Sequence, residues 1–350
     1  MRETKNRLAH DTPLEKQRDT HDVNDCPGTI QPSADPVIDI RGITKRFGDT
    51  VAVDGVSFAV NRGEVLGFLG PNAAGKTTTM RILTCYLVPD EGTASIAGHD
   101  ILDDAIEARR RLGYLPESAP LYLDMGVVEH LRFVAEMRGI PPGRIDSRIR
   151  DMVDVCGLGS VLHKDVAELS KGYKQRVGLA ITMIHDPDIL ILDEPTTGLD
   201  PSQIIEIREL IKRIGTEKTV ILSTHILPEV EATSSRVLII NEGRIVASGT
   251  PDELADMAIG SEGVRITLAA PEDEAHVTLE GLPGVSGVEA VGQEADGYRT
   301  YSIRGEDGTA LADRVFELVR DRGWRLRELR RETASLEDIF LRLTTGDDRR

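Results

Sequence analysis

The sequence is poor in features that would assign it to several common protein classes. Among its 350 residues are only three cysteines, an odd number without the spacing of metal ligands: Cys26, Cys85 and Cys156. Their scatter argues against a disulfide framework and favours the reduced thiols of a cytosolic protein. The sequence has no run of about 18 consecutive apolar residues, so we do not expect the chain to span a membrane by itself.

Positive charge is also scarce. The chain has 42 Lys and Arg residues against 59 Asp and Glu residues, a formal net charge of −17. A general nucleic-acid binder needs a basic face, so the composition argues against that class, although it leaves room for a local basic patch. Residues 1–36 combine both charge signs with almost no apolar periodicity. We therefore expect a disordered tail there, and not a signal peptide.

The most informative stretch is residues 70–77, GPNAAGKT, which fits the pattern G-x-x-x-x-G-K-[ST]. In such a loop the glycines permit a tight turn, and inward-facing N–H groups and the following helix attract an anion. We predict that Lys76 reaches the β- and γ-phosphates and that the Thr77 hydroxyl holds Mg²⁺. A chance match is disfavoured because an apolar run, residues 65–69, precedes the motif and apolar residues at helical spacing follow it.

Two acidic residues follow a second apolar run, residues 189–192, which is typical of a strand buried on both faces of a parallel sheet. They lie at the carboxyl end of that strand, where α/β sheets bind ligands. Asp193 suits Mg²⁺ ligation, and Glu194 suits the polarisation of a water for attack on a γ-phosphate. The alternative is a solvated acidic turn, which the phosphate loop makes the weaker interpretation.

Other candidate residues carry weaker signals. Ser170 is a reasonable N-cap of a helix, but a cap does not explain Gly172 inside the first turn, which invites close backbone approach. His225 follows a buried-type strand and could donate to a γ-phosphate oxygen, although a structural role is the usual one for a lone histidine. Phe47 could stack on a flat base or simply pack in a strand core.

The rest of the chain is organised around these motifs. One β segment begins at residue 38, and a second spans residues 50–60. A helical stretch at 121–164 is broken at residues 141–143. A hairpin is predicted at 236–248. After a linker-like helix from residue 250, we predict a small α+β module with strands, a helix near 311–319 and a helix-start signature at Ser335. No catalytic constellation is visible in that module.

Four motifs together resemble those of the ATP-binding subunits of ABC transporters, in chain order residues 70–77, 169–176, 189–195 and 223–225. The resemblance covers about residues 37–249 and implies an α/β P-loop NTPase fold, with a RecA-like core, an antiparallel β arm and a helical insert at about 117–165. Residues 251–350 would form the accessory α+β domain. The resemblance also implies an ATP sandwich dimer, in which the phosphate loop of one subunit and the signature motif of the other hold one nucleotide.

The resemblance assigns roles to individual residues. It implies that Phe47 stacks on adenine, that Glu194 is the catalytic base and that His225 is the switch histidine. ATP would be held by Phe47, Gly70, Pro71, Asn72, Ala73, Ala74, Gly75, Lys76, Thr77, Thr78, the signature residues Ser170 and Gly172, and the D-loop residue Asp200. Mg²⁺, the second implied cofactor, would be held by Thr77, Glu117 and Asp193.

Four positions depart from the family pattern. Ala73 replaces a glycine of the phosphate loop, but it falls at a free position of the pattern and we expect no harm. Glu117 replaces the glutamine of the Q-loop; it can still ligate Mg²⁺ but adds negative charge near the γ-phosphate. Lys171 and Tyr173 replace a glycine and a glutamine of the signature motif, and we expect hydrolysis to persist.

The function that follows is ATP hydrolysis that drives a separate transmembrane permease docked on the helical insert. The tail after residue 251 is similar to that of ABC-2-type exporter ATPases, and residues 113–117 and 170–173 look most like the gliding-motility subgroup. The resemblance implies a cytoplasmic protein, held at the inner face of the cell membrane by the permease, that pairs with an identical or a related subunit and needs no nucleic acid.

Two other functions remain open. One is a soluble ABC ATPase that acts on a nucleic-acid or translation complex, which the single ATP-binding unit, the acidic balance and the absence of sustained heptads disfavour. The other is a regulatory subunit that hydrolyses ATP poorly, which the presence of both Glu194 and His225 disfavours.

Overall fold

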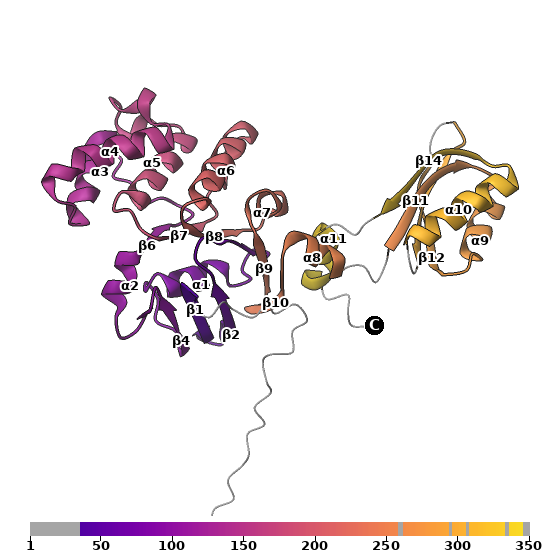
Figure 1. The fold of residues 1–350 in the computed structure, drawn as a ribbon, viewed down its shortest axis with the longest axis horizontal. Helices are drawn as coiled ribbons and strands as arrows, with labels where there is room; N and C mark the ends of the chain where they lie inside the picture. Colours follow the sequence, from indigo (N-terminus) through magenta and orange to yellow (C-terminus); the bar gives the residue numbers. More distant parts are fainter. Residues whose placement is uncertain (1–35, 258–261, 294–295, 306–307, 333–335, 346–350) are drawn as a thin grey trace, which may run out of the picture.

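The computed structural model describes residues 36–257, 262–293, 296–305, 308–332 and 336–345 (Figure 1). Residues 1–35 of the predicted tail at 1–36, and Ser335 of the helix-start signature, lie outside the described residues. Three sheets organise the rest of the chain: one of six strands and two of four strands.

The six-stranded sheet carries the phosphate loop and has the order β10-β9-β3-β8-β7-β6. Its strands are β3 (Val65–Leu69), β6 (Leu112–Leu115), β7 (Ile189–Asp193), β8 (Thr219–Thr224), β9 (Arg236–Asn241) and β10 (Arg244–Gly249). All residues of β3, β7 and β8 are buried, as the continuous apolar runs predict for strands covered on both faces. Because these three strands are parallel neighbours, their carboxyl ends meet at one edge of the sheet.

An antiparallel β arm of order β2-β1-β4-β5 covers one face of this sheet. It consists of β1 (Ile38–Phe47), β2 (Thr50–Val60), β4 (Glu91–Ile96) and β5 (His99–Asp100). Helix α1 (Lys76–Leu83) packs between arm and sheet, since Met80 and Ile82 share one buried cluster with residues of both. Helix α2 (Ala105–Arg111) leads from the arm into β6.

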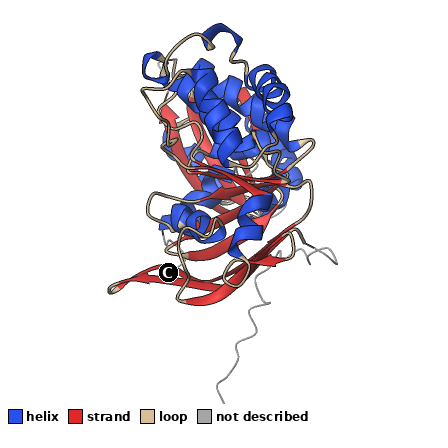
Figure 2. Ribbon diagram, turned by 90° about the vertical axis from the view of Figure 1, so that its left-hand side faces the viewer, coloured by secondary structure: helices blue, strands red, loops and turns tan. Residues whose placement is uncertain are grey.

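Helices α3 (Val127–Met137), α4 (Pro142–Cys156), α5 (Lys171–Met183) and α6 (Pro201–Gly215) lie together on the side of the six-stranded sheet away from the β arm (Figures 1 and 2). The predicted break at residues 141–143 is a helix start, because Pro142 occupies the first turn of α4, where its missing N–H costs nothing. Helix α7 (Leu227–Thr233) follows β8.

The C-terminal module has the chain order β11 (Glu262–Ala269), α9 (Glu272–Glu280), β12 (Val285–Gln293), β13 (Arg299–Gly305), α10 (Gly308–Arg322) and β14 (Arg325–Glu332). Its antiparallel sheet has the order β12-β13-β11-β14, which is the ferredoxin-like βαββαβ topology. The sequence predicted only an α+β module and missed α9. That helix buries little more than Ala275 and Leu279, so its apolar periodicity is weak.

The two helices that flank this module pack on the part of the chain that contains the six-stranded sheet. Leu254 of α8 (Pro251–Met257) and Leu336 and Ile339 of α11 (Leu336–Thr345) share a buried cluster with Leu69 of β3 and Ile239 of β9. The sequence assigned residues 251–350 to one accessory domain. Helices α8 and α11, near the two ends of this range, pack on the six-stranded sheet, and described residues between 262 and 332 form the ferredoxin-like fold.

A half-buried histidine near the end of α5 predicts a pH-dependent stability. Burial lowers the pKa of His185 to about 4, and Arg138 adds to this by repulsion. In the unfolded chain the pKa of His185 is near 6.5, so between pH 6.5 and pH 4 the unfolded state binds the proton more readily than the folded state. The folded state therefore keeps its full stability above pH 6.5 and loses stability as the pH falls toward 4. We expect the free energy of unfolding to fall by about 1–2 kcal/mol between pH 7 and pH 4, after allowance for solvent screening. Urea unfolding at the two pH values measures this loss.

The matched comparison for this prediction uses His185→Gln and, on an exposed site, His163→Gln. The His185 variant is expected to lose less stability than the wild type between the two pH values, while the His163 variant follows the wild type. If the pH dependence of His185→Gln equals that of the wild type, the buried neutral imidazole is not its cause.

Candidate functional site

The phosphate loop connects β3 to α1, and its two glycines are required by close packing. Gly75 has a φ of +104°, and a Cβ there would lie 2.5 Å from the carbonyl oxygen of Ala52 in β2. A Cβ at Gly70 would collide with the carbonyl oxygen of Ile240. The pattern of the loop is thus fixed by the backbone of neighbouring strands as well as by any ligand.

The backbone at Ala73 adopts a conformation that favours glycine, which the sequence pattern does not indicate. Its φ is +64°, in the left-handed region. A residue with a Cβ pays about 1–2 kcal/mol for that conformation, whereas a glycine does not. The alanine is compatible with the loop but makes it more strained than a glycine would. Pro71, Asn72 and Ala73 form the accessible turn of the loop, and Ala74 and Gly75 are buried.

The ammonium group of Lys76 lies over the loop. It donates to the carbonyl oxygens of Gly70 at 2.8 Å and Pro71 at 3.1 Å. It also lies 3.4 Å from Oε1 of Glu194, and both side chains are almost fully buried. The fold therefore joins the end of β7 to the loop through an ion pair, at the edge where the parallel strands end.

Asp193 has the properties of a cation ligand. It is fully buried, and the Ser223 hydroxyl donates to its Oδ1 at 2.8 Å. Its Oδ2 is buried and lacks a hydrogen-bond partner among the described residues. Burial raises the pKa of Asp193, and the hydroxyls of Ser223 and Thr77 act in the opposite direction. A buried carboxylate oxygen without a partner, close to a hydroxyl, fits a hard cation such as Mg²⁺.

Glu194 and His225 form a direct pair. Nδ1 of His225 lies 2.8 Å from Oε2 of Glu194, and the Thr197 hydroxyl donates to the same oxygen at 3.2 Å. Glu194 has a φ of +50°, and its N–H donates to the carbonyl oxygen of Ser223. The glutamate is thus held in a strained backbone conformation between Lys76 and His225, the arrangement of a residue positioned for function.

Three other predicted residues lie at helix starts. Ser170 is exposed and caps α5 by accepting the N–H of Tyr173 at 3.4 Å. Asp200 caps α6 through the N–H of Gln203 at 2.9 Å, and the hydroxyl of Ser202 and this N–H lower its pKa. Gly172 is buried against the Gln203 side chain. Among the described contacts, none connects Ser170 or Asp200 to the phosphate loop of the same chain.

Phe47 and Glu117 are both exposed. Phe47 ends β1, and half of its surface is exposed. The Lys45 ammonium lies over its ring, 5.7 Å from the ring centroid. The second strand of the same hairpin reaches the phosphate loop at Ala52. Glu117 lies two residues beyond β6, at the same edge of the sheet as Asp193. Within the described part of the chain, Glu117 makes no hydrogen bond or ion pair with Thr77 or Asp193.

The sequence did not indicate the roles of four hydroxyls near this edge of the sheet. Thr197 and Ser223 donate to Glu194 and Asp193, and Thr196 and Thr224 donate to Glu229. Their signal is a cluster of small hydroxyl residues at two strand ends, which is too common in turns to be distinctive. The sequence also did not indicate the role of Glu229, because an acidic residue in the first turn of a helix reads as an ordinary surface residue.

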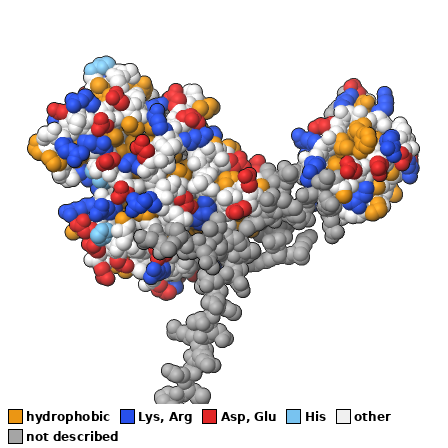
Figure 3. Space-filling view, viewed as in Figure 1, with side chains coloured by type: hydrophobic (Ala, Val, Ile, Leu, Met, Phe, Trp, Pro, Cys, Tyr) orange, Lys and Arg blue, Asp and Glu red, His pale blue; other side chains and the backbone are white. Residues whose placement is uncertain are grey.

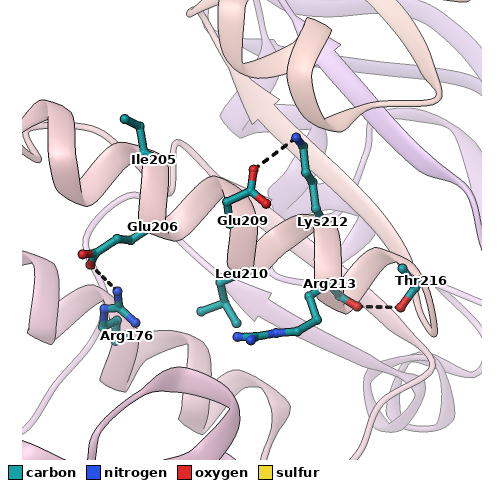
Figure 4. A pocket seen from close by; sticks show the side chains of 8 residues that line it. All are labelled: Arg176, Ile205, Glu206, Glu209, Leu210, Lys212, Arg213 and Thr216. Carbon is teal, nitrogen blue, oxygen red and sulfur yellow. Dashed lines mark hydrogen bonds and ion pairs between the residues drawn. The ribbon is translucent and has the colours of Figure 1, made fainter.

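A surface hollow lies along α6, away from the phosphate loop (Figure 4). Its charged groups already have partners: Glu206 pairs with Arg176, Glu209 with Lys212 at 3.2 Å, and Arg213 donates to the carbonyl oxygen of Val155. The hollow thus offers no unpaired charge for a nucleotide.

In the described part of the chain, no helix combines the length and the hydrophobicity that a membrane span requires.

Comparisons with known proteins identify the family of the chain. The family description "ABC transporter" matches residues 53–197. The chain is 35% identical to the Nod factor export ATP-binding protein I of Ralstonia nicotianae, over 88% of this chain and 94% of that protein. It is 34% identical to the daunorubicin resistance ATP-binding protein DrrA3 of Streptomyces coeruleorubidus, over 91% and 98% of the two chains.

Solved structures give the same result. A structure of an ATP-binding subunit of an ABC transporter matches with a TM-score of 0.58 and 30% identity, covering 63% of this chain and 93% of that chain. The cbiO1 subunit from Clostridium perfringens matches with a TM-score of 0.59 and 27% identity, covering 71% and 96%.

Proposed function

Because the chain belongs to the ATP-binding subunits of ABC transporters and is an ATPase of that family, we propose that it closes as an ATP sandwich dimer to drive a separate transmembrane permease. The observation that carries this proposal is the connected set of side chains at the sheet edge. Lys76, Glu194 and His225 form one continuous series of contacts there.

These residues can divide the chemistry of hydrolysis among themselves. Glu194 accepts the proton of a water whose oxygen attacks the γ-phosphorus, and the bond from that phosphorus to the bridging oxygen of ADP breaks. Lys76 offsets negative charge on the β- and γ-phosphates, and His225 holds the γ-phosphate and orients Glu194. Mg²⁺ held by Thr77 and Asp193 would neutralise charge on the β- and γ-phosphates when bound.

A second subunit completes the site in this proposal. Ser170 is exposed at the start of α5, and its contacts in this chain are those of a helix cap. A γ-phosphate placed against an exposed helix N-terminus of a partner would be stabilised by its N–H groups and dipole. The exposed turn formed by Pro71, Asn72 and Ala73 is accessible to such a partner.

We propose export as the direction of transport. The relatives named for Nod factor export and daunorubicin resistance are matched over more than nine-tenths of their length. Similarity over the C-terminal module as well as the ATP-binding region supports an ABC-2-type exporter, with the gliding-motility subgroup as the finer proposal. The subunit would then act in the cytoplasm, at the inner face of the membrane.

An exposed apolar surface supports a docked permease. Arg138 at the end of α3 donates to the carbonyl oxygen of Arg109 in α2 at 3.5 Å, which brings these helices together. Near that contact Ile106 is 61% exposed and Met137 is 70% exposed. Figure 3 shows basic side chains over α2, whose last turn contributes Arg109, Arg110 and Arg111. Exposed apolar side chains beside basic ones are typical of a protein-binding surface.

The experiment that tests this function is co-purification. Tagged Glu194→Gln protein, expressed in its native cell and purified with ATP from detergent-solubilised membranes, is expected to bring with it a polytopic protein that has no ATP-binding domain. Adding Met137→Glu is expected to lower the yield of that partner at least about tenfold, because it buries a charge in the interface. Val277→Glu, on the exposed face of α9, is the matched control.

Recovery of the tagged protein only from the soluble fraction, with ribosomes or other nucleic-acid complexes, would instead support the alternative of an ABC ATPase that acts on a non-transport partner. Equal yields of the membrane partner with Met137→Glu and Val277→Glu would exclude the α2–α3 surface as the docking site.

A further inference from the structure

Helix α7 carries a buried glutamate directly behind the proposed catalytic pair. Glu229 is 1% exposed, and it lies in the first turn of a seven-residue helix that follows β8. Burial of a carboxylate costs free energy unless its oxygens accept hydrogen bonds. The contacts of Glu229 therefore show what its buried position requires.

Each carboxylate oxygen of Glu229 accepts a hydrogen bond from a different segment. Oε1 accepts from the Thr196 hydroxyl, and Oε2 accepts from the Thr224 hydroxyl at 2.9 Å. Both threonines are almost fully buried, at 1% and 0% exposure. Thr224 Oγ1 also accepts the N–H of Ile226 at 3.1 Å, which fixes the start of the turn that carries His225.

The two threonines flank the residues of the site. Thr196 is two positions after Glu194, and Thr224 immediately precedes His225. We propose that Glu229 is a positioning residue for ATP hydrolysis, which holds the end of β7 and the end of β8 at the separation that the contact between Glu194 and His225 requires. This inference rests on the catalytic roles proposed above for those two residues.

A carboxylate suits this task for a specific reason. An ionised carboxylate is acceptor-only at both oxygens, so it can accept from two hydroxyl donors on different segments at the same time. An amide of the same shape presents an acceptor at one end and a donor at the other. Stability alone does not account for a buried charge, since apolar groups of equal volume often serve as well.

Helix α7 also provides a fixed support. The Thr233 hydroxyl donates to the carbonyl oxygen of Glu229 at 2.6 Å. The neighbouring Val230 is fully buried in the cluster that contains Leu69 of β3 and Ile339 of α11. Glu229 is therefore attached to the six-stranded sheet independently of the two turns that it joins.

The test compares steady-state ATP hydrolysis by the full-length wild type, Glu229→Gln, and Glu231→Gln, whose glutamate is exposed on the same helix. Glu229→Gln is expected to lower kcat about tenfold and to leave the KM for ATP within about twofold, because the phosphate loop is untouched. Glu231→Gln is expected to change neither parameter. Thermal unfolding of each variant checks that the fold is intact.

A thermodynamic cycle separates positioning from general destabilisation. The double variant Thr196→Val with Thr224→Val removes both donors, and adding Glu229→Gln to it is expected to cause no further loss of kcat, because the three side chains act as one unit. If Glu229→Gln does not fold, the two single threonine variants are each expected to lower kcat about threefold at unchanged KM.

Either of two results would overturn the inference: an unchanged kcat in Glu229→Gln, or full additivity of its effect with those of the threonine variants. Glu194→Gln is measured in the same assay. If that variant retains turnover, the catalytic assignment itself fails; if it is inactive while Glu229→Gln is not impaired, only the positioning role fails.

Discussion

Glu194→Gln is expected to bind ATP with nearly unchanged affinity and to hydrolyse it at least about 100-fold more slowly. The amide has the size of the carboxylate and can keep contact with His225 and Thr197, but it cannot accept the proton of the attacking water. Phosphate release under saturating Mg·ATP measures the turnover, and equilibrium binding of labelled ATP measures the affinity.

Glu231→Gln is the control for Glu194→Gln, since it removes the same charge from an exposed position. A Glu194→Gln protein with the turnover of the wild type would show that another group accepts the proton. A protein that has lost ATP binding would instead show that the glutamate is needed to organise the loop through its ion pair with Lys76.

Lys76→Met is expected to weaken ATP binding roughly 10- to 150-fold, the loss of about 1.5–3 kcal/mol that a hydrogen bond to a charged group contributes. Lys76 is 6% exposed and lies at the phosphate loop, so water cannot readily substitute for its ammonium group. Equilibrium binding measured with and without Mg²⁺ tests the effect.

Lys212→Met, which removes an exposed lysine from α6, is the control for Lys76→Met. The Lys76 variant also leaves Glu194 without its buried cation, so its melting temperature must be measured alongside binding. Unchanged affinity in a folded Lys76→Met protein would contradict the assignment of the loop as the phosphate site.

The sequence predicted those parts of the fold in which a local pattern decides the structure. The continuous apolar runs ending at Leu69 and Leu192 fix the buried parallel strands, and the second β segment has the predicted bounds. Once two strands are parallel neighbours, the residues after them must be close together. The meeting of Lys76, Glu194 and His225 is a consequence of that topology.

Other features depend on contacts between residues far apart in the chain. The packing of α11 on β9 brings together segments about 100 residues apart in the sequence, and no local sequence pattern predicts it. The left-handed backbone of Ala73 cannot be inferred from a pattern that admits any residue there. Glu229 is acidic and begins a helix, as many exposed residues do, and only the folded chain reveals its two threonine partners.

The central claim, that two subunits close around ATP, is tested most directly by the mass of Glu194→Gln protein in solution, measured by light scattering with and without Mg·ATP. We expect ATP to convert a species of about 38 kDa into one of twice that mass, and we expect the added Ser170→Arg substitution at the exposed start of α5 to abolish this change. A folded, ATP-binding Glu194→Gln protein with the same mass in both conditions would contradict the central claim.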